Sequence, residues 1–225
     1  MGTLYIVPTP IGNLEDMTLR ALRVLKSVRL IAAEDTRHSH KLTSHFEIDT
    51  PMTSYFEHNK LRKLPFILGA LDSGDVALIS DAGTPGISDP GYELIRAAIE
   101  QGVEVVVLPG PNAIFTGLSV SGLNTAPFRF YGFLPRKEKQ MRDFLDALAD
   151  YPETLVFYES PNRLLKTLQL MLDSLGNRQA VVAVEMTKMF EEFQRAPLSD
   201  LIAFYDANPL RGEVTLMVSG KIDDE

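Results

Sequence analysis

The sequence contains no cysteine among its 225 residues, which excludes disulfide bridges and thiolate metal sites and fits a reducing compartment. No apolar run approaches the ~18 residues that a membrane-spanning helix needs, so no membrane partner is expected. The first residues also lack the basic and apolar segments of a secretory signal peptide. We therefore expect a cytoplasmic protein.

Two common nucleotide-binding motifs are also missing. The sequence has no Gly-X-X-X-X-Gly-Lys-Ser/Thr segment, and no Gly-X-Gly-X-X-Gly follows its first predicted strand. These absences argue against an ATPase and an NAD-dependent dehydrogenase. The net charge of -8 argues against non-specific binding of nucleic acid, although basic residues cluster locally at residues 58–63 and 136–142. Solvated helix faces are the alternative interpretation of both clusters.

A metal site has little support. The only spacing that suggests one is the His-X-His pair of His38 and His40, because imidazole is a common metal ligand. The pair lies in a polar stretch, which favours histidines at the surface or in contact with an anion. No metal is expected.

The first half of the chain alternates short apolar runs with helical periodicity. Strands are predicted at residues 4–7, 30–33, 52–55, 76–79 and 103–108. A helix is predicted at residues 18–28, with Asp16 as its N-cap. Strands that alternate with helices imply βαβ crossovers and a largely parallel sheet covered on both faces.

The second half places its strands closer together, around helices predicted at residues 138–149 and 162–175. Its strands are predicted at residues 130–133, 154–158, 180–184 and 214–218. We therefore predict an α/β protein of two domains, residues 1–122 with a parallel sheet and residues 123–225 with a mixed sheet. A small-molecule cleft is expected between such domains.

Unusual loops follow four of the predicted strands, at residues 6–14, 32–37, 79–91 and 108–113. In open α/β sheets ligands bind outside the carboxyl ends of the strands, so these loops are predicted to form one site. Five of the twelve residues from Ser80 to Gly91 are glycine or proline, which suits close approach of backbone to a ligand. Within this loop Asp81 is the candidate ligand contact, whereas Asp89 is predicted to cap a helix that starts near Tyr92.

The loops contain few basic anchors for a phosphate. Backbone-rich, glycine- and proline-rich loops favour a ligand without phosphate groups, such as the adenosyl sulfonium of S-adenosylmethionine. Tight turns without any ligand are the alternative explanation of the same composition.

Longer motifs give the sequence a family resemblance. They are Val-Pro-Thr-Pro-Ile-Gly-Asn-Leu (7–14), Ala-Ala-Glu-Asp-Thr-Arg (32–37), Ser-Asp-Ala-Gly-Thr-Pro (80–85), Ser-Asp-Pro-Gly (88–91), Leu-Pro-Gly-Pro (108–111), Phe-Tyr-Glu-Ser-Pro-Asn-Arg-Leu (157–164), Glu-Met-Thr-Lys-Met-Phe-Glu-Glu (185–192) and Arg-Gly-Glu-Val-Thr-Leu-Met-Val (211–218). In this order they closely resemble the bacterial 16S ribosomal RNA cytidine ribose 2′-O-methyltransferases of the tetrapyrrole methylase superfamily. Many members of that family continue into a further small helical domain beyond the point where this chain ends.

The resemblance implies a two-domain, homodimeric methylase that holds S-adenosylmethionine between its domains. It also implies a cytidine ribose in the decoding region of 16S rRNA, in the small ribosomal subunit, as the target. The implied cofactor-binding residues are Pro10, Ile11, Gly12, Asp81, Ala82, Gly83, Thr84, Pro109, Gly110, Pro111, Asn112 and Ala113 in the first domain, and Tyr158, Met186 and Glu213 in the second.

The catalytic candidates follow the second predicted strand. We expect Glu34 or Asp35 to orient or deprotonate the ribose hydroxyl, while Arg37 holds a neighbouring phosphate. An internal ion pair between Glu34 and Arg37 is the structural alternative. Lys188 is the rival base if burial depresses its pKa, and its partner in a structural pair would be Glu185.

Other functions stay open at this point. C-methylation of a tetrapyrrole shares the fold and the cofactor, and a non-catalytic ligand-binding assembly protein would share the site. Glu159, Asn162 and Arg163 are candidates for contact with RNA or cofactor, although Ser160 and Pro161 also form an ordinary helix start. RNA is expected to meet the basic residues at 136–142.

Overall fold

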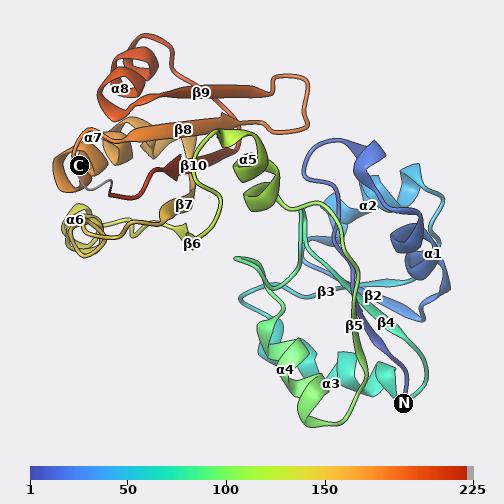
Figure 1. Cartoon of the computed structure of the whole chain (residues 1–225). Helices are drawn as coiled ribbons and strands as arrows, with labels where there is room; N and C mark the ends of the chain where they lie inside the picture. The colour runs from blue at the N-terminus through green and yellow to red at the C-terminus, as the bar shows by residue number, and fades with distance from the viewer. Residues whose placement is uncertain (222–225) are drawn as a thin grey trace. The chain divides into compact units, whose positions relative to one another are not determined.

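The computed structural model describes residues 1–221, and the last four residues of the chain lie outside this range. The chain forms two compact units, unit 1 (Met1–Asn112) and unit 2 (Ala113–Glu225) (Figure 1). The boundary placed from the sequence comes later, after residue 122. The difference is helix α5 (Ala113–Ser121), which packs on strand β10 (Val214–Val218) of unit 2.

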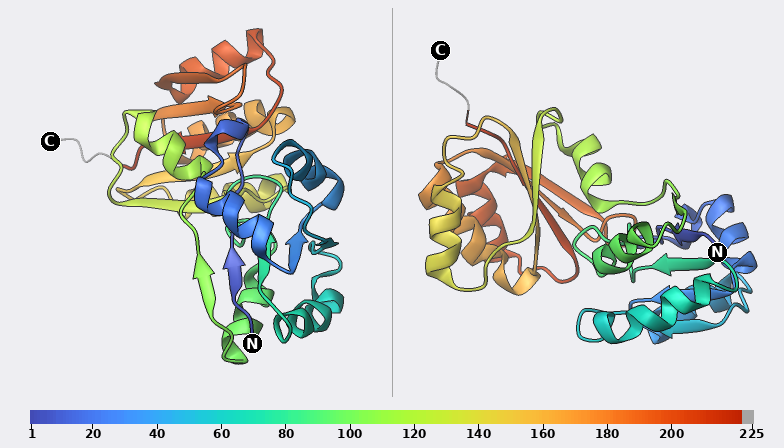
Figure 2. Two further views of the ribbon diagram at one scale, coloured as in Figure 1. Left: turned by 90° about the vertical axis from the view of Figure 1, so that its right-hand side faces the viewer. Right: turned by 90° about the horizontal axis from the view of Figure 1, so that it is seen from below.

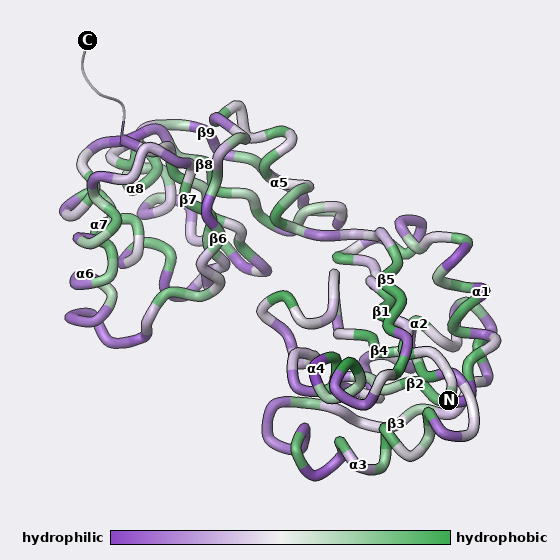
Figure 3. The backbone as a smooth tube through the Cα atoms, turned by 60° about the horizontal axis from the view of Figure 1, so that its bottom comes forward, coloured by the Kyte–Doolittle hydropathy of each residue, from purple (hydrophilic) through white to green (hydrophobic). Residues whose placement is uncertain are grey.

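Unit 1 is built on a parallel five-stranded sheet, as predicted. Its strands are β1 (Leu4–Ile6), β2 (Leu30–Ala33), β3 (Met52–Ser54), β4 (Val76–Ile79) and β5 (Val105–Val107). They lie in the order β3-β2-β4-β1-β5 and all neighbouring pairs are parallel. Every residue of β2 and β4 is buried, which is why these strands appear in the sequence as unbroken apolar runs. Figure 3 shows β1 and β5 as hydrophobic segments of unit 1.

Two pairs of helices cover the two faces of this sheet. Helices α1 (Leu19–Ser27) and α2 (Thr36–His45) share one apolar cluster with the sheet, in which Leu25 and Leu42 pack with Ile31. Helices α3 (Lys60–Leu71) and α4 (Tyr92–Glu100) share the other, on the opposite face. The unit is therefore a three-layer α/β fold.

The start of α1 corrects one prediction. Its N-cap is Thr18, whose hydroxyl accepts a hydrogen bond of 3.1 Å from the amide of Ala21. Asp16 instead ends the short 3-10 helix η1 (Leu14–Asp16). Threonine and aspartate are both good N-cap residues, and Thr18 caps α1 because it directly precedes the first helical residue.

Unit 2 contains a mixed five-stranded sheet, again as predicted. Its strands are β6 (Phe128–Phe133), β7 (Thr154–Glu159), β8 (Gln179–Val184), β9 (Glu192–Pro197) and β10, in the order β6-β7-β10-β8-β9. Only β6 and β7 pair in parallel. Strand β9 was not predicted, because it is a polar strand at the edge of the sheet, where apolar alternation is not needed.

Three helices cover one face of this second sheet. They are α6 (Glu138–Asp146), α7 (Leu164–Leu175), which follows the short 3-10 helix η2 (Pro161–Arg163), and α8 (Leu198–Ala207). Their apolar side chains form one cluster with Leu216, whereas the neighbouring Met217 lies against Gly117 of α5. Figure 2 shows α5 on the side of the sheet away from these helices. No helix within residues 1–221 is long and apolar enough to cross a membrane.

Candidate functional site

The four unusual loops of unit 1 follow the carboxyl ends of β1, β2, β4 and β5. Because the strands are parallel, these ends lie at one edge of the sheet, as the sequence predicted. The loop after β4 forms hydrogen bonds with each of the other three, so the four loops form one connected structure.

The loops after β1 and β4 are joined through their backbones. The amide of Thr9 donates to the carbonyl of Gly83 at 2.9 Å, and the amide of Gly83 donates back to Thr9 at 3.0 Å. Gly83 has a φ of +79°, a conformation that strains residues with a side chain. The glycine of the Ser-Asp-Ala-Gly-Thr-Pro motif is therefore required by this contact.

The loops after β4 and β5 are joined through side chains. The hydroxyl of Thr84 donates to the carbonyl of Pro111 at 3.3 Å and accepts a hydrogen bond of 3.3 Å from the side-chain Nδ2 of Asn112. The loop after β5 also lies close to the loop after β1, because a Cβ added to Gly110 would be 2.7 Å from the Cβ of Pro8. Backbone atoms of Gly110 can approach this position only because the residue has no side chain.

The loop after β2 brings carboxylates to the same edge. The amide of Asp35 donates to the carboxylate of Asp81 at 3.1 Å, and the amide of Asp81 donates to the carboxylate of Glu34 at 3.4 Å. Burial raises the pKa of Glu34 above its ordinary value; the Asp81 amide opposes this shift and the Asp81 carboxylate adds to it. A carboxyl group with a raised pKa is a stronger proton acceptor than an ordinary glutamate.

Asp35 has a different environment. It is the N-cap of α2, where its carboxylate accepts a hydrogen bond of 2.8 Å from the backbone amide of Arg37. The same carboxylate forms an ion pair of 3.0 Å with the Arg37 guanidinium. Hydrogen bonds from Arg37 lower the pKa of Asp35 to about 2. The anticipated alternative of a pair between Glu34 and Arg37 does not describe this arrangement, because Asp35 is the partner of Arg37. The Arg37 side chain is 91% exposed, which leaves it accessible to an anion.

The end of the loop after β4 corrects another prediction. Helix α4 begins at Tyr92, as expected, but its N-cap is Gly91 and no side chain caps it. A Cβ at Gly91 would lie 2.9 Å from the amide nitrogen of Gly86, so the tight packing of the loop on itself determines the residue at this position. Asp89 is therefore not the helix cap.

The candidate residues of unit 2 share one edge of its sheet. Val214 at the start of β10 is paired with Glu159 at the end of β7 and with Val184 at the end of β8. Tyr158, Met186 and Glu213 lie within two residues of these three positions in the chain. Met186 is buried and Glu213 is exposed, while the ring of Tyr158 lies 5.0 Å from that of Phe130.

A strained turn follows β8 at this edge. Glu185 and Thr187 have φ values of 49° and 67°, which are uncommon outside glycine. The turn is held because the Glu185 carboxylate accepts hydrogen bonds of 2.8 Å from both the amide of Glu213 and the ammonium of Lys188. The predicted pair of Glu185 and Lys188 is therefore confirmed.

Lys188 does not meet the condition for acting as the base, which is a pKa lowered by burial. Burial alone would lower the pKa of Lys188, but the carboxylates of Glu185 and Glu213, at 2.8 and 3.0 Å, outweigh burial and raise it. Lys188 therefore stays protonated and cannot accept a proton near neutral pH. No pattern in the sequence indicates the bond from Lys188 to Glu213, because Glu213 lies far along the chain.

Glu159 and Arg163 have structural partners. The buried Glu159 carboxylate accepts hydrogen bonds from the Ser160 amide at 2.7 Å and from the Thr167 hydroxyl at 2.6 Å. Arg163 approaches Glu159 at 3.5 Å and donates to the carbonyls of Leu134 and Pro135. These contacts support the interpretation of the motif as a helix start, and only Asn162 of the three candidates is exposed.

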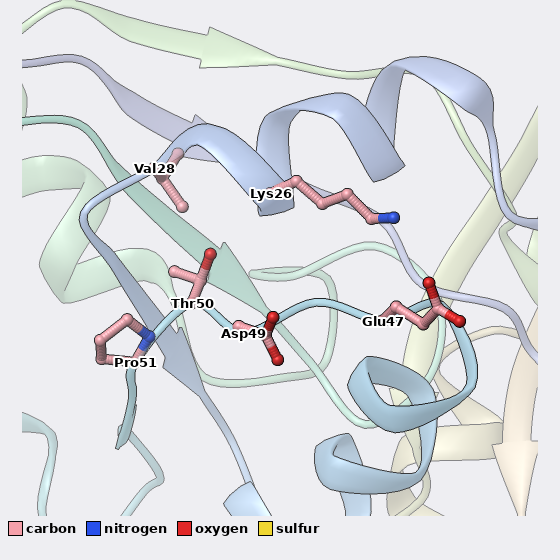
Figure 4. Close-up of a pocket in the computed structure, with 6 residues that line it drawn as sticks. All are labelled: Lys26, Val28, Glu47, Asp49, Thr50 and Pro51. Carbon is pink, nitrogen blue, oxygen red and sulfur yellow. The ribbon is translucent and has the colours of Figure 1, made fainter.

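A separate hollow of about 350 Å³ lies in unit 1 (Figure 4). It is lined by Lys26, Val28, Glu47, Asp49, Thr50 and Pro51. Lys26 lies in the last turn of α1, and the others lie between α1 and β2 or between α2 and β3, so the hollow lies at the amino ends of the strands. None of the predicted site residues is among them.

Comparison with known proteins places the sequence in a defined group. Residues 3–202 match the family described as Tetrapyrrole (Corrin/Porphyrin) Methylases. The chain is 51% identical to "Ribosomal RNA small subunit methyltransferase I" of Vibrio cholerae serotype O1, over 98% of this chain and 78% of the relative. It is 50% identical to the proteins of the same name from Bacillus subtilis, over 100% of this chain and 77% of the relative, and from Streptococcus pyogenes serotype M1, over 97% and 77%.

Proposed function

The chain belongs to the family of tetrapyrrole (corrin/porphyrin) methylases, and from this premise we propose that it methylates the ribosomal RNA of the small subunit. The proposed reaction is 2′-O-methylation of a cytidine ribose with S-adenosylmethionine as methyl donor. The observation that carries this proposal is the identity of 50% or more, over nearly the whole chain, to relatives named for small-subunit ribosomal RNA. It favours RNA over a tetrapyrrole as the substrate.

S-adenosylmethionine is the methyl donor, and the loops of unit 1 fit it. The segments at residues 8–12, 80–84 and 108–112 contain no lysine or arginine, which suits a ligand without phosphate groups. Hydrogen bonds within the protein join these loops to one another, so little ordering of the loops would accompany binding. When bound, the cofactor supplies an electrophilic methyl group on a sulfonium.

We assign cofactor binding first to the segments that meet at the loop after β4. They are Pro10 to Gly12, Asp81 to Thr84 and Pro109 to Ala113. Asp81 is the principal acceptor, since one of its carboxylate oxygens is held by the Asp35 amide and the carboxylate is only half-buried. Contributions from Tyr158, Met186 and Glu213 stay a prediction, which calorimetry of S-adenosylmethionine binding to Tyr158→Ala and Glu213→Ala variants would test.

Glu34 is our proposed general base. It accepts the proton that the ribose 2′-hydroxyl loses as the hydroxyl oxygen forms its bond to the methyl carbon and the bond from that carbon to sulfur breaks, leaving the electron pair on sulfur. Its raised pKa matches this role, which typically contributes about 10² to 10⁴ in rate. Asp35 serves as the N-cap of α2 and positions Arg37, and Arg37 holds a phosphate beside the target nucleotide.

The decisive experiment offers radiolabelled S-adenosylmethionine to the protein with three acceptors in parallel. These are small ribosomal subunits that lack the modification, deproteinised ribosomal RNA and uroporphyrinogen. We expect label in the RNA of the small subunit, released as a 2′-O-methylated nucleoside. Label in the tetrapyrrole alone would overturn the proposal, and cofactor binding without any transfer would favour a non-catalytic protein.

We also propose that the protein is a cytoplasmic homodimer. A ribosomal substrate supports the location. Met189 and Phe190, neighbours in the chain between β8 and β9, are 90% and 77% exposed, and large apolar side chains left at a surface are often covered by a partner. Light scattering of the purified protein should give twice the mass of the chain, and a monomeric mass at micromolar concentration would contradict the dimer.

A further inference from the structure

Helices α1 and α2 carry positive charge and no negative charge. Five of the 22 lysines and arginines lie in them, and none of the 30 aspartates and glutamates does. The five residues are Arg20, Arg23, Lys26, Arg37 and Lys41, and all of them are exposed. In a chain with a net charge of -8 this is a pronounced concentration of cations.

The two helices form one layer of unit 1. Both pack on the same face of the sheet, through Val24 and Leu25 of α1 and Leu42 of α2. Each helix starts at the edge of the sheet where the candidate site lies, because α1 follows the loop after β1 and α2 follows the loop after β2. Arg20, Arg37 and the exposed His38 are therefore at the end of the layer next to the site.

Most of these cations are not neutralised by the protein. Within residues 1–221, Arg20, Arg23, Lys26 and Lys41 form no ion pair with a carboxylate, and only Arg37 has such a partner, Asp35. Exposed cations without protein partners are surrounded by mobile counterions. A polyanion that displaces these ions gains free energy from their release.

We propose that this surface, the α1–α2 basic face (Arg20, Arg23, Arg37, His38 and Lys41), binds the phosphodiester backbone of RNA next to the target nucleotide. The inference rests on the proposed function and adds the surface through which the RNA is held. Arg20 and Arg23 are one helical turn apart, as are Arg37 and Lys41, so each helix presents a row of cations along its exposed side. Rows of cations suit the regularly spaced anions of a nucleic acid backbone.

The basic groups at residues 58–63 and 136–142 are less suited to binding the RNA backbone. At residues 136–142, Arg142 is paired with Asp173 at 3.4 Å, and Glu138 lies among the cations. At residues 58–63, Lys60 is paired with both Glu57 and Glu93. Carboxylates lie among the cations in both places. Helices α1 and α2 themselves contain none, and of the cations on this face only Arg37 has a carboxylate partner within residues 1–221, Asp35 at the N-cap of α2.

The basic face ends before the last turn of α1. Lys26, in the last turn of α1, borders the hollow that Glu47 and Asp49 also line (Figure 4). These carboxylates make that end less favourable to a phosphate. The binding surface is accordingly assigned to the first two turns of both helices and omits Lys26.

The test uses the whole protein with the double variant Arg20→Glu/Arg23→Glu and the single variant Lys41→Glu. Glutamate is a good helix former and is favoured near a helix N-terminus, so both variants should fold. Binding to unmethylated small subunits is measured over a series of potassium chloride concentrations. We expect the double variant to bind at least ~10-fold more weakly and to lower the magnitude of the log-log salt slope by about 2.

A matched control carries the same change of charge elsewhere. Arg62 and Arg136 are exposed and form no ion pair within the described residues, and Arg62 lies in α3 on the opposite face of the sheet. The double variant Arg62→Glu/Arg136→Glu should bind within ~2-fold of the wild type. Affinity for S-adenosylmethionine, measured by calorimetry, should be unchanged in all variants.

Two outcomes would overturn the basic face while leaving the proposed function intact. In the first, the wild type methylates small subunits but Arg20→Glu/Arg23→Glu binds them no worse than the control. In the second, that variant loses affinity for subunits but binds deproteinised ribosomal RNA as the wild type does, which would identify a ribosomal protein as the partner. A wild type that transfers no methyl group to small-subunit RNA would refute the proposed function itself.

Discussion

The amide of Asp35 donates a hydrogen bond of 3.1 Å to the carboxylate of Asp81. This contact joins the two loops that we assign to the ribose hydroxyl and to the cofactor. The Asp81 amide in turn reaches Glu34 at 3.4 Å, so a change at Asp81 acts on both functions. Substitutions of Asp81 must therefore distinguish two roles of its carboxylate: its negative charge, and its hydrogen bond to the loop after β2.

Asp81→Ala should abolish measurable binding of S-adenosylmethionine without unfolding the protein. The alanine removes both the proposed cofactor acceptor and the partner of the Asp35 amide. Asp81→Asn keeps an oxygen for that amide and should therefore bind with intermediate affinity. Calorimetry measures binding and circular dichroism monitors the fold; unchanged affinity in Asp81→Ala would reject the assignment.

Glu34→Gln should lower turnover by about 10² to 10⁴ with little change in cofactor affinity, as expected for loss of a general base. The base acts in its deprotonated form, so wild-type activity should fall as the pH drops through the Glu34 pKa. Because burial raises that pKa, the fall should occur at a higher pH than for an ordinary glutamate.

The acidic limb of the pH profile distinguishes Glu34 from its neighbour. Asp35 has a pKa of about 2, so its titration lies well below the range in which the activity is measured. Asp35→Asn should keep the limb, and Glu34→Gln should lose it. A normal profile and near-normal turnover in Glu34→Gln would exclude Glu34 as the base.

Gly110→Ala should destabilise unit 1 and weaken cofactor binding. Its Cβ would lie 2.7 Å from the Cβ of Pro8, so the loops after β1 and β5 must separate. Overpacking of this kind lowers the free energy of unfolding by about 1 to 3 kcal/mol, which urea denaturation would detect.

Gly69→Ala is the control for Gly110→Ala. Gly69 lies in α3, where an added Cβ meets no atom within 4 Å. Alanine should therefore raise the free energy of unfolding by about 0.5 to 1 kcal/mol. Equal effects of the two substitutions would show that close approach of the loops at Gly110 does not matter.

The sequence predicted the parts of the fold that depend on local pattern. Strands β2 and β4 are buried on both faces, so their residues are uniformly apolar and easy to identify. Strand β9 pairs with one neighbour only and carries a polar sequence, so no pattern marked it. The same reasoning explains why the four loops of unit 1 could be placed together, since a parallel sheet fixes where its strands end.

The details of the site depended on contacts between distant residues. Arg37 could have paired with Glu34 or Asp35, and the start of α2 decides for Asp35, which also caps the helix. The N-cap of α4 is Gly91 and not Asp89, because the loop packs so tightly on Gly86 that only glycine fits before the helix. Neither choice is determined by residue type and spacing alone.

Lys188 provides the clearest case and a final prediction. Its pKa is raised because Glu213, which is distant in sequence, joins Glu185 beside it. Lys188→Met should reduce turnover by less than ~10-fold, since it removes a contact of the strained turn and no proton acceptor. The acidic limb of its pH profile should match that of the wild type.

The matched variant for this prediction is Glu185→Gln, which weakens the same turn by removing the charge of the other member of the Glu185–Lys188 ion pair. Because Glu185 and Lys188 contact each other, the double variant should lose less stability in urea than the two single losses added together. If Lys188→Met instead abolished turnover while cofactor affinity and stability stayed normal, Lys188 would have to act directly on the substrate. The base would then have to be sought in unit 2, and the raised pKa of Glu34 would lose its proposed catalytic meaning.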